Sequence, residues 1–150
     1  MDNLELLKST VLFRGSSKEE LELVNGLFQE RLIKPNTTIF TEKMHSESLY
    51  VIKSGSVRIT MMVGEGEEKS LLLLGQGEFF GELALIQEAD RQVTARVEEP
   101  TEILVMTRKD FQALMDLDPR TASRLLMMIT KLLAARIKAY TEKLKVVLLS

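Results

Sequence analysis

The sequence predicts an α+β fold, in which an antiparallel β jelly-roll barrel lies between a short N-terminal helical subdomain and a long C-terminal helix. Three observations indicate this fold class. Apolar residues recur at helical spacing before residue 30, they alternate with polar residues in short segments from 31 to 107, and no Gly or Pro interrupts the chain from 120 to 148. We therefore divide the chain into 1–117, the helices and barrel, and 118–150, the C-terminal helix.

The N-terminal segment predicts two short helices. A helical turn is expected over 4–9. Ser17 precedes an apolar repeat, and Glu20 stands three residues later, which is the spacing of a capping box. The second helix is therefore expected to begin after Ser17 and to continue to about Phe28.

From Arg31 onward, a period of two predicts strands. Short loops that contain glycine, or the pair Pro35 and Asn36, separate them. The expected strands are 31–34, 37–41, 48–53, 56–63, 69–74, 92–97 and 101–107. A succession of short strands joined by tight turns favours a jelly roll.

After the last strand, the pattern predicts a helix over 108–117 and a longer one over 120–148, which would be about 40–45 Å long. Apolar residues of the longer helix recur every three or four positions, which is the spacing of a pairing helix. They are Ala122, Leu126, Ile129, Leu133, Ile137, Tyr140, Leu144 and Val147. We expect a homodimer through this helix; the alternative is a helix packed back onto its own barrel.

Composition excludes several classes of protein. The chain has 150 residues, of which 45% are hydrophobic, and a net charge of −2, so it offers no overall field that favours nucleic acid or an anionic membrane. Because it lacks cysteine, it has neither a disulfide framework nor a thiolate nucleophile or ligand. The N-terminus lacks a signal-peptide apolar region, and no apolar run is long enough to cross a bilayer. We expect a cytoplasmic protein without membrane contact.

No nucleophile and base are paired in a recognisable motif, so we expect no catalytic residue and no enzymatic activity. His45 is the only histidine, and with Glu42 and Glu47 nearby it is a candidate metal ligand. A solvated loop histidine is the favoured interpretation, and we expect no metal site and no cofactor. Glu82 and Asp90 can be interpreted as a carboxylate pair for acid–base chemistry, but Asp90 is expected in a loop.

The stretch 77–97, GEFFGELALIQEADRQVTARV, carries the candidate binding site. Gly81 at the start of a helical turn lets a ligand approach the backbone, and the first amides of such a turn favour an anion. Arg91 can grip a phosphate with two hydrogen bonds. Glu82 can accept hydrogen bonds from sugar hydroxyls. This combination suits a nucleotide of low charge.

Residues 80–85, FGELAL, followed by Arg91 and a strand, resemble the phosphate-binding cassette of the cyclic nucleotide-binding domain family. The resemblance implies that Glu82 binds the ribose 2′-hydroxyl and that Arg91 binds the cyclic phosphate. The segment 48–59, SLYVIKSGSVRI, is also similar to the family. We call residues 77–97 the cassette from here on.

The resemblance further implies contacts from the backbone amides of Gly81, Leu83 and Gln92. Gln92 departs from the family pattern, which mostly has Ala, Ser or Thr there, and its larger side chain is expected to crowd the site. Upstream, Glu42 begins a Glu-Lys-Met sequence where the family often has Glu-Gly-Asp. That loop is expected to lie away from the phosphate.

In the bacterial regulators of this family, an equivalent long helix forms the dimer and carries adenine contacts. The resemblance therefore makes Arg136, Tyr140 and Thr141 candidates for base contacts. In those regulators a DNA-binding helix-turn-helix domain follows the helix, whereas this sequence ends at Ser150, so no direct DNA binding by this chain is expected.

The leading hypothesis is a regulatory sensor that binds a cyclic nucleotide, with cAMP the first guess, and signals through the C-terminal helix. One alternative is a structural module of the same fold that binds no nucleotide, which Gln92 motivates. Another is the sensor fragment of a transcription regulator, which the apolar residues 146–149 motivate.

Overall fold

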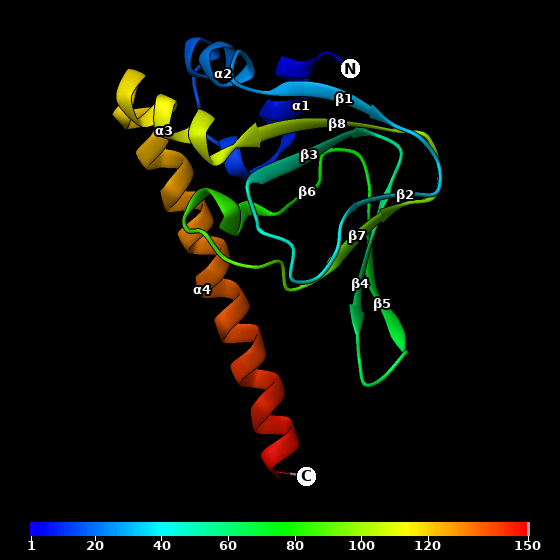
Figure 1. The fold of residues 1–150 in the computed structure, drawn as a ribbon. Helices are drawn as coiled ribbons and strands as arrows, with labels where there is room; N and C mark the ends of the chain where they lie inside the picture. The colour runs from blue at the N-terminus through cyan, green and yellow to red at the C-terminus, as the bar shows by residue number, and fades with distance from the viewer. Residues whose placement is uncertain (150) are drawn as a thin grey trace.

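Two four-stranded antiparallel sheets face each other in a jelly roll, with strand orders β1-β8-β3-β6 and β2-β7-β4-β5 (Figure 1). The computed structural model describes residues 1–149, so Ser150 of the predicted 118–150 segment lies outside the described part. The strands are β1 (Gln29–Ile33), β2 (Thr37–Phe40), β3 (Ser48–Ser54), β4 (Val57–Met62), β5 (Glu68–Leu74), β6 (Phe79–Phe80), β7 (Thr94–Val97) and β8 (Thr101–Thr107). The antiparallel jelly roll predicted from the alternating segments is confirmed.

Helices precede and follow the barrel strands along the chain, and one short helix, η2, lies between β6 and β7. They are α1 (Asn3–Ser9), η1 (Val11–Phe13), α2 (Lys18–Asn25), η2 (Glu82–Leu85), α3 (Arg108–Leu117) and α4 (Pro119–Leu149), where η marks a short 3-10 helix. Both halves of the capping box at Ser17 and Glu20 are formed. α2 ends three residues before the predicted Phe28, because the amides of Leu27 and Phe28 bond to carbonyls only three residues back. The chain thereby turns into β1.

The first sheet separates two apolar cores, because alternate residues of its central strands face opposite sides. Leu49, Val51 and Leu104 face the helices, where they pack with residues of α1, α2, α3 and α4. Ile52 and Ile103 face the second sheet and fill the barrel. The helices are therefore fixed to one face of the sheet, and the barrel interior lies on the other.

The long helix α4 is divided into a packed half and a projecting half (Figure 1). Ala122, Leu125 and Ile129 are at most 2% exposed and belong to the core formed with the other helices. From residue 134 to 149 every side chain is exposed. The prediction of a pairing seam along the whole helix is therefore wrong for its first half, because Ala122 and Ile129 are buried within the chain itself. For that half, the alternative of a helix packed onto its own domain is correct.

A polar contact fastens the packed half of α4 to α2. The Oε2 atom of Glu20 accepts hydrogen bonds from the Arg124 guanidinium and, at 2.8 Å, from the Thr121 hydroxyl. The hydrogen bond from Arg124 holds the pKa of Glu20 well below its usual range, at about 2. The start of α4 is thus held by an ion pair as well as by apolar packing.

Within residues 1–149, no helix has both the length and the apolar character that crossing a membrane requires.

Candidate functional site

The cassette turns at Gly81, which immediately precedes η2. Gly81 has a φ of +79°, in the left-handed region that side chains disfavour. A Cβ atom at this position would lie 2.8 Å from Arg91 Nη1 and 2.8 Å from the Ser48 carbonyl oxygen. Both the backbone conformation and the lack of space therefore require glycine here, and they bring the cassette backbone against the Arg91 guanidinium.

Arg91 is buried between the two sheets, although it is a charged residue. It is 8% exposed, and its guanidinium carbon lies 4.1 Å from the Phe40 ring centroid of β2 and 5.7 Å from the Tyr50 ring centroid of β3. Its Nη2 donates to the Ser48 carbonyl oxygen at 2.9 Å. Burial lowers the pKa of Arg91, and nearby Tyr50 and Glu82 partly oppose this shift.

The Arg91 guanidinium has an N–H donor that is not used within the described part of the chain. Its Nε is buried and has no hydrogen-bond partner within the described residues 1–149. A buried guanidinium stays charged, and an unpaired buried donor is costly unless an acceptor satisfies it. Arg91 therefore places a charged side chain with an unpaired Nε donor in the cassette, against the rings of Phe40 and Tyr50.

Glu82, the first residue of η2, is 5% exposed and faces the long helix. Its Oε1 accepts a hydrogen bond from Nη1 of Arg136 in α4. Arg136 lies near the middle of α4, so this contact joins η2 to that part of the long helix. Of the three candidates for base contacts, Arg136 thus reaches the cassette within a single chain.

The other two candidates on α4 point elsewhere. Tyr140 is 65% exposed, and the Thr141 hydroxyl donates to the Ile137 carbonyl of its own helix at 2.9 Å. The structure therefore brings together Glu82, Arg91 and Arg136, but it does not bring Tyr140 or Thr141 to the cassette of the same chain.

The remaining two predicted site residues turn their side chains outward. Leu83 is 42% exposed, so its predicted contribution is confined to its backbone amide. Gln92 is exposed, and its Nε2 donates to the Asp90 carbonyl oxygen at 3.3 Å. The expectation that the Gln92 side chain crowds the site is wrong, because that side chain folds back along its own loop.

The loop 41–47 lies directly along the cassette, which the sequence analysis did not foresee. The Lys43 amide donates to the Arg91 carbonyl at 2.8 Å, and the Arg91 amide donates to the Met44 carbonyl at 2.7 Å. The Ser46 amide donates to the Ala89 carbonyl at 2.9 Å. The loop therefore contacts the cassette backbone at Ala89 and Arg91, and its distance from the phosphate stays a prediction. Because the contacts use backbone atoms, no residue type in the sequence signals them.

His45 does not form a metal centre with the two predicted glutamates. Its Nε2 lies 4.0 Å from Oε2 of the exposed Glu88, while Oε1 of Glu42 accepts a hydrogen bond from the Met62 amide. Within residues 1–149, no cluster of three or more His, Cys, Asp or Glu side chains could hold a metal ion.

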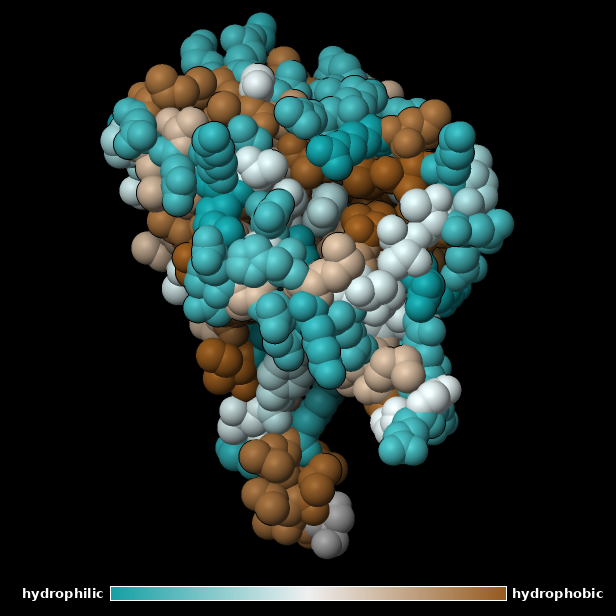
Figure 2. Space-filling model, in the orientation of Figure 1, coloured by the Kyte–Doolittle hydropathy of each residue, from teal (hydrophilic) through white to brown (hydrophobic). Residues whose placement is uncertain are grey.

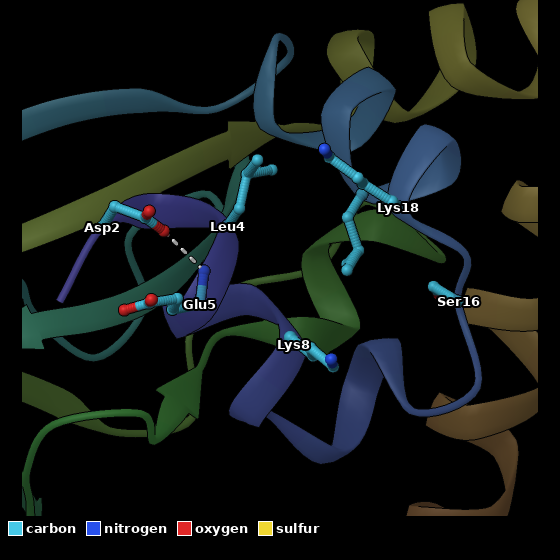
Figure 3. Close-up of a pocket in the computed structure, with 7 residues that line it drawn as sticks. Asp2, Leu4, Glu5, Lys8, Ser16 and Lys18 are labelled. Atoms are coloured by element: carbon cyan, nitrogen blue, oxygen red, sulfur yellow. Dashed lines mark hydrogen bonds between the residues drawn. The ribbon is translucent and has the colours of Figure 1, made fainter.

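A separate cavity of about 240 Å³ lies between α1 and α2, apart from the cassette (Figure 3). It is lined by Asp2, Leu4, Glu5, Lys8, Ser16, Lys18 and Leu21. Figure 3 shows the Asp2 carboxylate accepting a hydrogen bond from the Glu5 amide, which caps α1. The polar groups here are thus engaged partly in capping the helix, and none belongs to the predicted site.

Comparison with known proteins connects this site to a family. The family model described as "Cyclic nucleotide-binding domain" matches residues 30–118, which include Gly81, Glu82 and Arg91. The chain is 36% identical over 125 residues to the "Cyclic AMP receptor protein" of Thermus thermophilus. The alignment covers 83% of this chain and 58% of that relative, so the chain spans little more than half of its length.

Solved structures agree with this match. The catabolite activator protein of Thermus thermophilus superposes with a TM-score of 0.83 at 34% identity, covering 92% of this chain and 63% of that one. The regulatory domain of Toxoplasma gondii PKA, solved with cAMP, gives a TM-score of 0.68 at 29% identity, covering 74% of this chain and 42% of that one. From the matched residues and the shared fold, the chain belongs to the cyclic nucleotide-binding domain family.

Proposed function

We propose that the chain is a regulatory module that binds a cyclic nucleotide in the cassette. The observation that carries this proposal is the buried Arg91 guanidinium, whose Nε has no partner among residues 1–149, together with the buried carboxylate of Glu82 that interacts electrostatically with it. A cyclic phosphate would supply the missing acceptor for Arg91, and a ribose hydroxyl would donate to Glu82. The backbone amides of Gly81, Leu83 and Gln92 would complete the anion site.

We take cAMP as the first candidate ligand. The relative from Thermus thermophilus is named as a cyclic AMP receptor, and the similar PKA regulatory domain was solved with cAMP. Arg136 would then lie at the sugar, and Tyr140 and Thr141, about one turn further along α4, would be available to the base.

The contact between Arg136 and Glu82 supports a route for the signal. A ribose hydroxyl that donates to Glu82 competes with Arg136 for the same carboxylate, so binding changes the interaction that holds the middle of α4 at the cassette. Ligand would therefore shift the population of α4 positions. In this proposal residues 1–117 receive the ligand, and residues 118–150 carry the signal.

We further propose that α4 pairs with α4 of a second copy through its projecting half. Ile137, Leu144 and Val147 are each at least 55% exposed, and the lower end of the molecule is a hydrophobic surface in Figure 2. A two-fold axis along this half would bury the same face of both helices. The dimer seam would then begin beyond the packed half of α4.

Isothermal titration of the chain with cAMP, cGMP and cyclic dinucleotides tests the binding proposal. Saturable binding of one of them supports it and identifies the base. Binding of none of them would overturn the proposal and leave a structural module of the same fold.

A further inference from the structure

Arg108, the first residue of α3, connects three segments that surround the site. Its Nη1 donates to carbonyl oxygens of Ala84 at 2.9 Å, of Ser46 at 3.1 Å and of Gln87 at 3.3 Å. Its Nη2 lies 3.4 Å from Oε1 of Glu88. The side chain is only 17% exposed, so these contacts form in a partly dehydrated setting, where hydrogen bonds from a charged donor are strong.

The acceptors belong to the two segments that carry the proposed ligand-binding side chains. Ala84 and Gln87 lie at the end of the turn that begins with Glu82, where carbonyl groups lack helical partners. Ser46 lies in the loop 41–47, which hydrogen-bonds to the backbone of Arg91. Arg108 therefore fixes the segment that carries Glu82 relative to the loop that fixes Arg91.

The same residue is anchored to the helices. Its backbone amide donates to the Glu47 carbonyl at 2.8 Å, and α3 begins at Arg108 behind a complete capping box formed by Thr107 and Asp110. Further along α3, Phe111 and Leu114 are buried in the core that also contains Ala122 and Leu125 of α4. A displacement of η2 would thus act on the start of α3 through a charged multi-donor side chain, and on α4 through packing.

We propose that Arg108 is a positioning residue, which sets the relative placement of Glu82 and Arg91 for the ligand and transmits the response of the cassette to α3 and α4. This inference rests on the proposed function. A guanidinium suits the task because its planar array of donors serves several carbonyl oxygens at once, whereas the neutral amide of glutamine cannot reproduce either the charge or the reach. A lysine keeps the charge and has three N–H donors, but they lie on one compact ammonium and lack the planar fork of the guanidinium.

The test compares Arg108→Gln and Arg108→Lys with the matched control Lys109→Gln. The control removes the same charge from the neighbouring residue of α3, whose side chain is exposed. Affinity for cAMP, or for whichever nucleotide of the panel binds best, is measured by calorimetry well below the melting temperature of each variant. Circular dichroism establishes that each variant is folded, so that a lower affinity cannot reflect loss of the fold.

A second readout follows α4 itself. The chain has no cysteine, so Lys138→Cys on the exposed part of α4 offers a single site for an environment-sensitive fluorophore. The change in fluorescence at saturating nucleotide reports how strongly the cassette acts on α4. A role confined to stability would leave this saturated change as it is in the labelled chain without a substitution at Arg108.

We expect Arg108→Gln to weaken nucleotide binding by about tenfold. When the residue that hydrogen-bonds to a metal ligand is mutated, metal affinity typically falls by about 10–100-fold, and we take the lower end of that range for this residue behind the ligand-binding side chains. We expect a smaller saturated fluorescence change in the same variant, and partial recovery of both in Arg108→Lys. Lys109→Gln should bind as the unmodified chain does. If Arg108→Gln does not fold, Arg108→Lys carries the test, with weaker binding expected than for Lys109→Gln.

Two negative results are distinguishable. Absence of binding by the unmodified chain would overturn the proposed function and this inference with it. Binding by the unmodified chain, with equal affinity and equal fluorescence change in the folded Arg108 variants, would overturn this inference alone.

Discussion

Gly81 shows how a single residue controls the shape of the site. Gly81→Ala would place a methyl group 2.8 Å from both Arg91 Nη1 and the Ser48 carbonyl, at a φ of +79°. We expect a loss of about 1–3 kcal/mol in the free energy of unfolding and weaker nucleotide binding, because the guanidinium must move. Urea denaturation and calorimetric titration measure the two effects.

Gly64→Ala is the matched control for this prediction. Gly64 has a φ of +81°, but a Cβ there meets nothing within 4 Å. Gly64→Ala should therefore lose stability only through the unfavourable backbone conformation, because its methyl group contacts no other atom. Its nucleotide affinity should not change. Equal losses of stability and affinity in both variants would contradict the role that we give to the contact with Arg91.

Arg91 is the residue on which ligand affinity depends most directly. Arg91→Ala removes the cation that a buried phosphate would require, so we expect binding to weaken by roughly 3–5 kcal/mol. Because the guanidinium is itself buried with an unpaired Nε, the ligand-free protein should remain folded. Calorimetry with cAMP measures the change, and Arg58→Ala, on the outer face of β4, is the control. Unchanged affinity in Arg91→Ala would rule out phosphate binding by this residue.

At the scale of elements, the ion pair between α2 and α4 gives stability a predictable dependence on pH. The pKa of Glu20 is lowered from 4.5 to about 2, chiefly by the hydrogen bond from Arg124. A carboxyl with a lowered folded-state pKa stabilises the protein above its unfolded-state pKa. That stabilisation is lost as the pH falls from about 4.5 towards 2.

Glu20→Gln isolates this contribution, because glutamine can still complete the capping box but carries no charge for Arg124. We expect a loss of about 1–2 kcal/mol at pH 7, less than the full pKa shift implies, because the pair is partly exposed to solvent. Urea denaturation at pH 7 and pH 3 should show the difference between the variant and the unmodified chain shrinking at low pH. Glu22→Gln, exposed on the same helix, is the control; a difference that stays constant with pH would contradict the assignment.

α4 is an element whose two halves have different environments, although its sequence pattern is continuous. The same spacing of apolar residues places Ile129 in the core and Ile137 in solvent, at 0% and 66% exposure. The difference arises because the body of the domain extends only along the first half of the helix (Figure 1). An apolar seam therefore predicts that a helix has a partner, but not which partner each part of the helix contacts.

For the whole molecule, the proposed dimer depends on the projecting half of α4. Leu144 is 55% exposed, so Leu144→Glu should not disturb the fold of one chain, but in a two-fold dimer it would place two carboxylates at the seam. We expect dimerisation to weaken by at least about 2 kcal/mol. Sedimentation equilibrium measures this change, and Lys131→Glu, exposed on α4, is the control. A monomeric unmodified chain, or an unaffected dimer, would contradict the proposed seam.

The sequence by itself determined the fold class, most element boundaries to within two residues, and the stretch of chain that forms the cassette. These features are local: the period of the apolar residues specifies each strand or helix, and Gly81, Glu82 and Arg91 lie within one short stretch of chain. β8 and α3 agree with their predicted bounds to the residue, since Thr107 and Asp110 mark the boundary between them with a capping box.

Only the tertiary structure decided what surrounds those residues. It placed Arg136 on Glu82, the loop 41–47 on the backbone of Arg91, and Arg108 between η2 and that loop. The physical reason is that many of these contacts end on backbone amides and carbonyls, which nearly every residue possesses, and that they join segments far apart in the chain. Such contacts leave no periodic or compositional trace, so they appear only when the folded path of the chain is known.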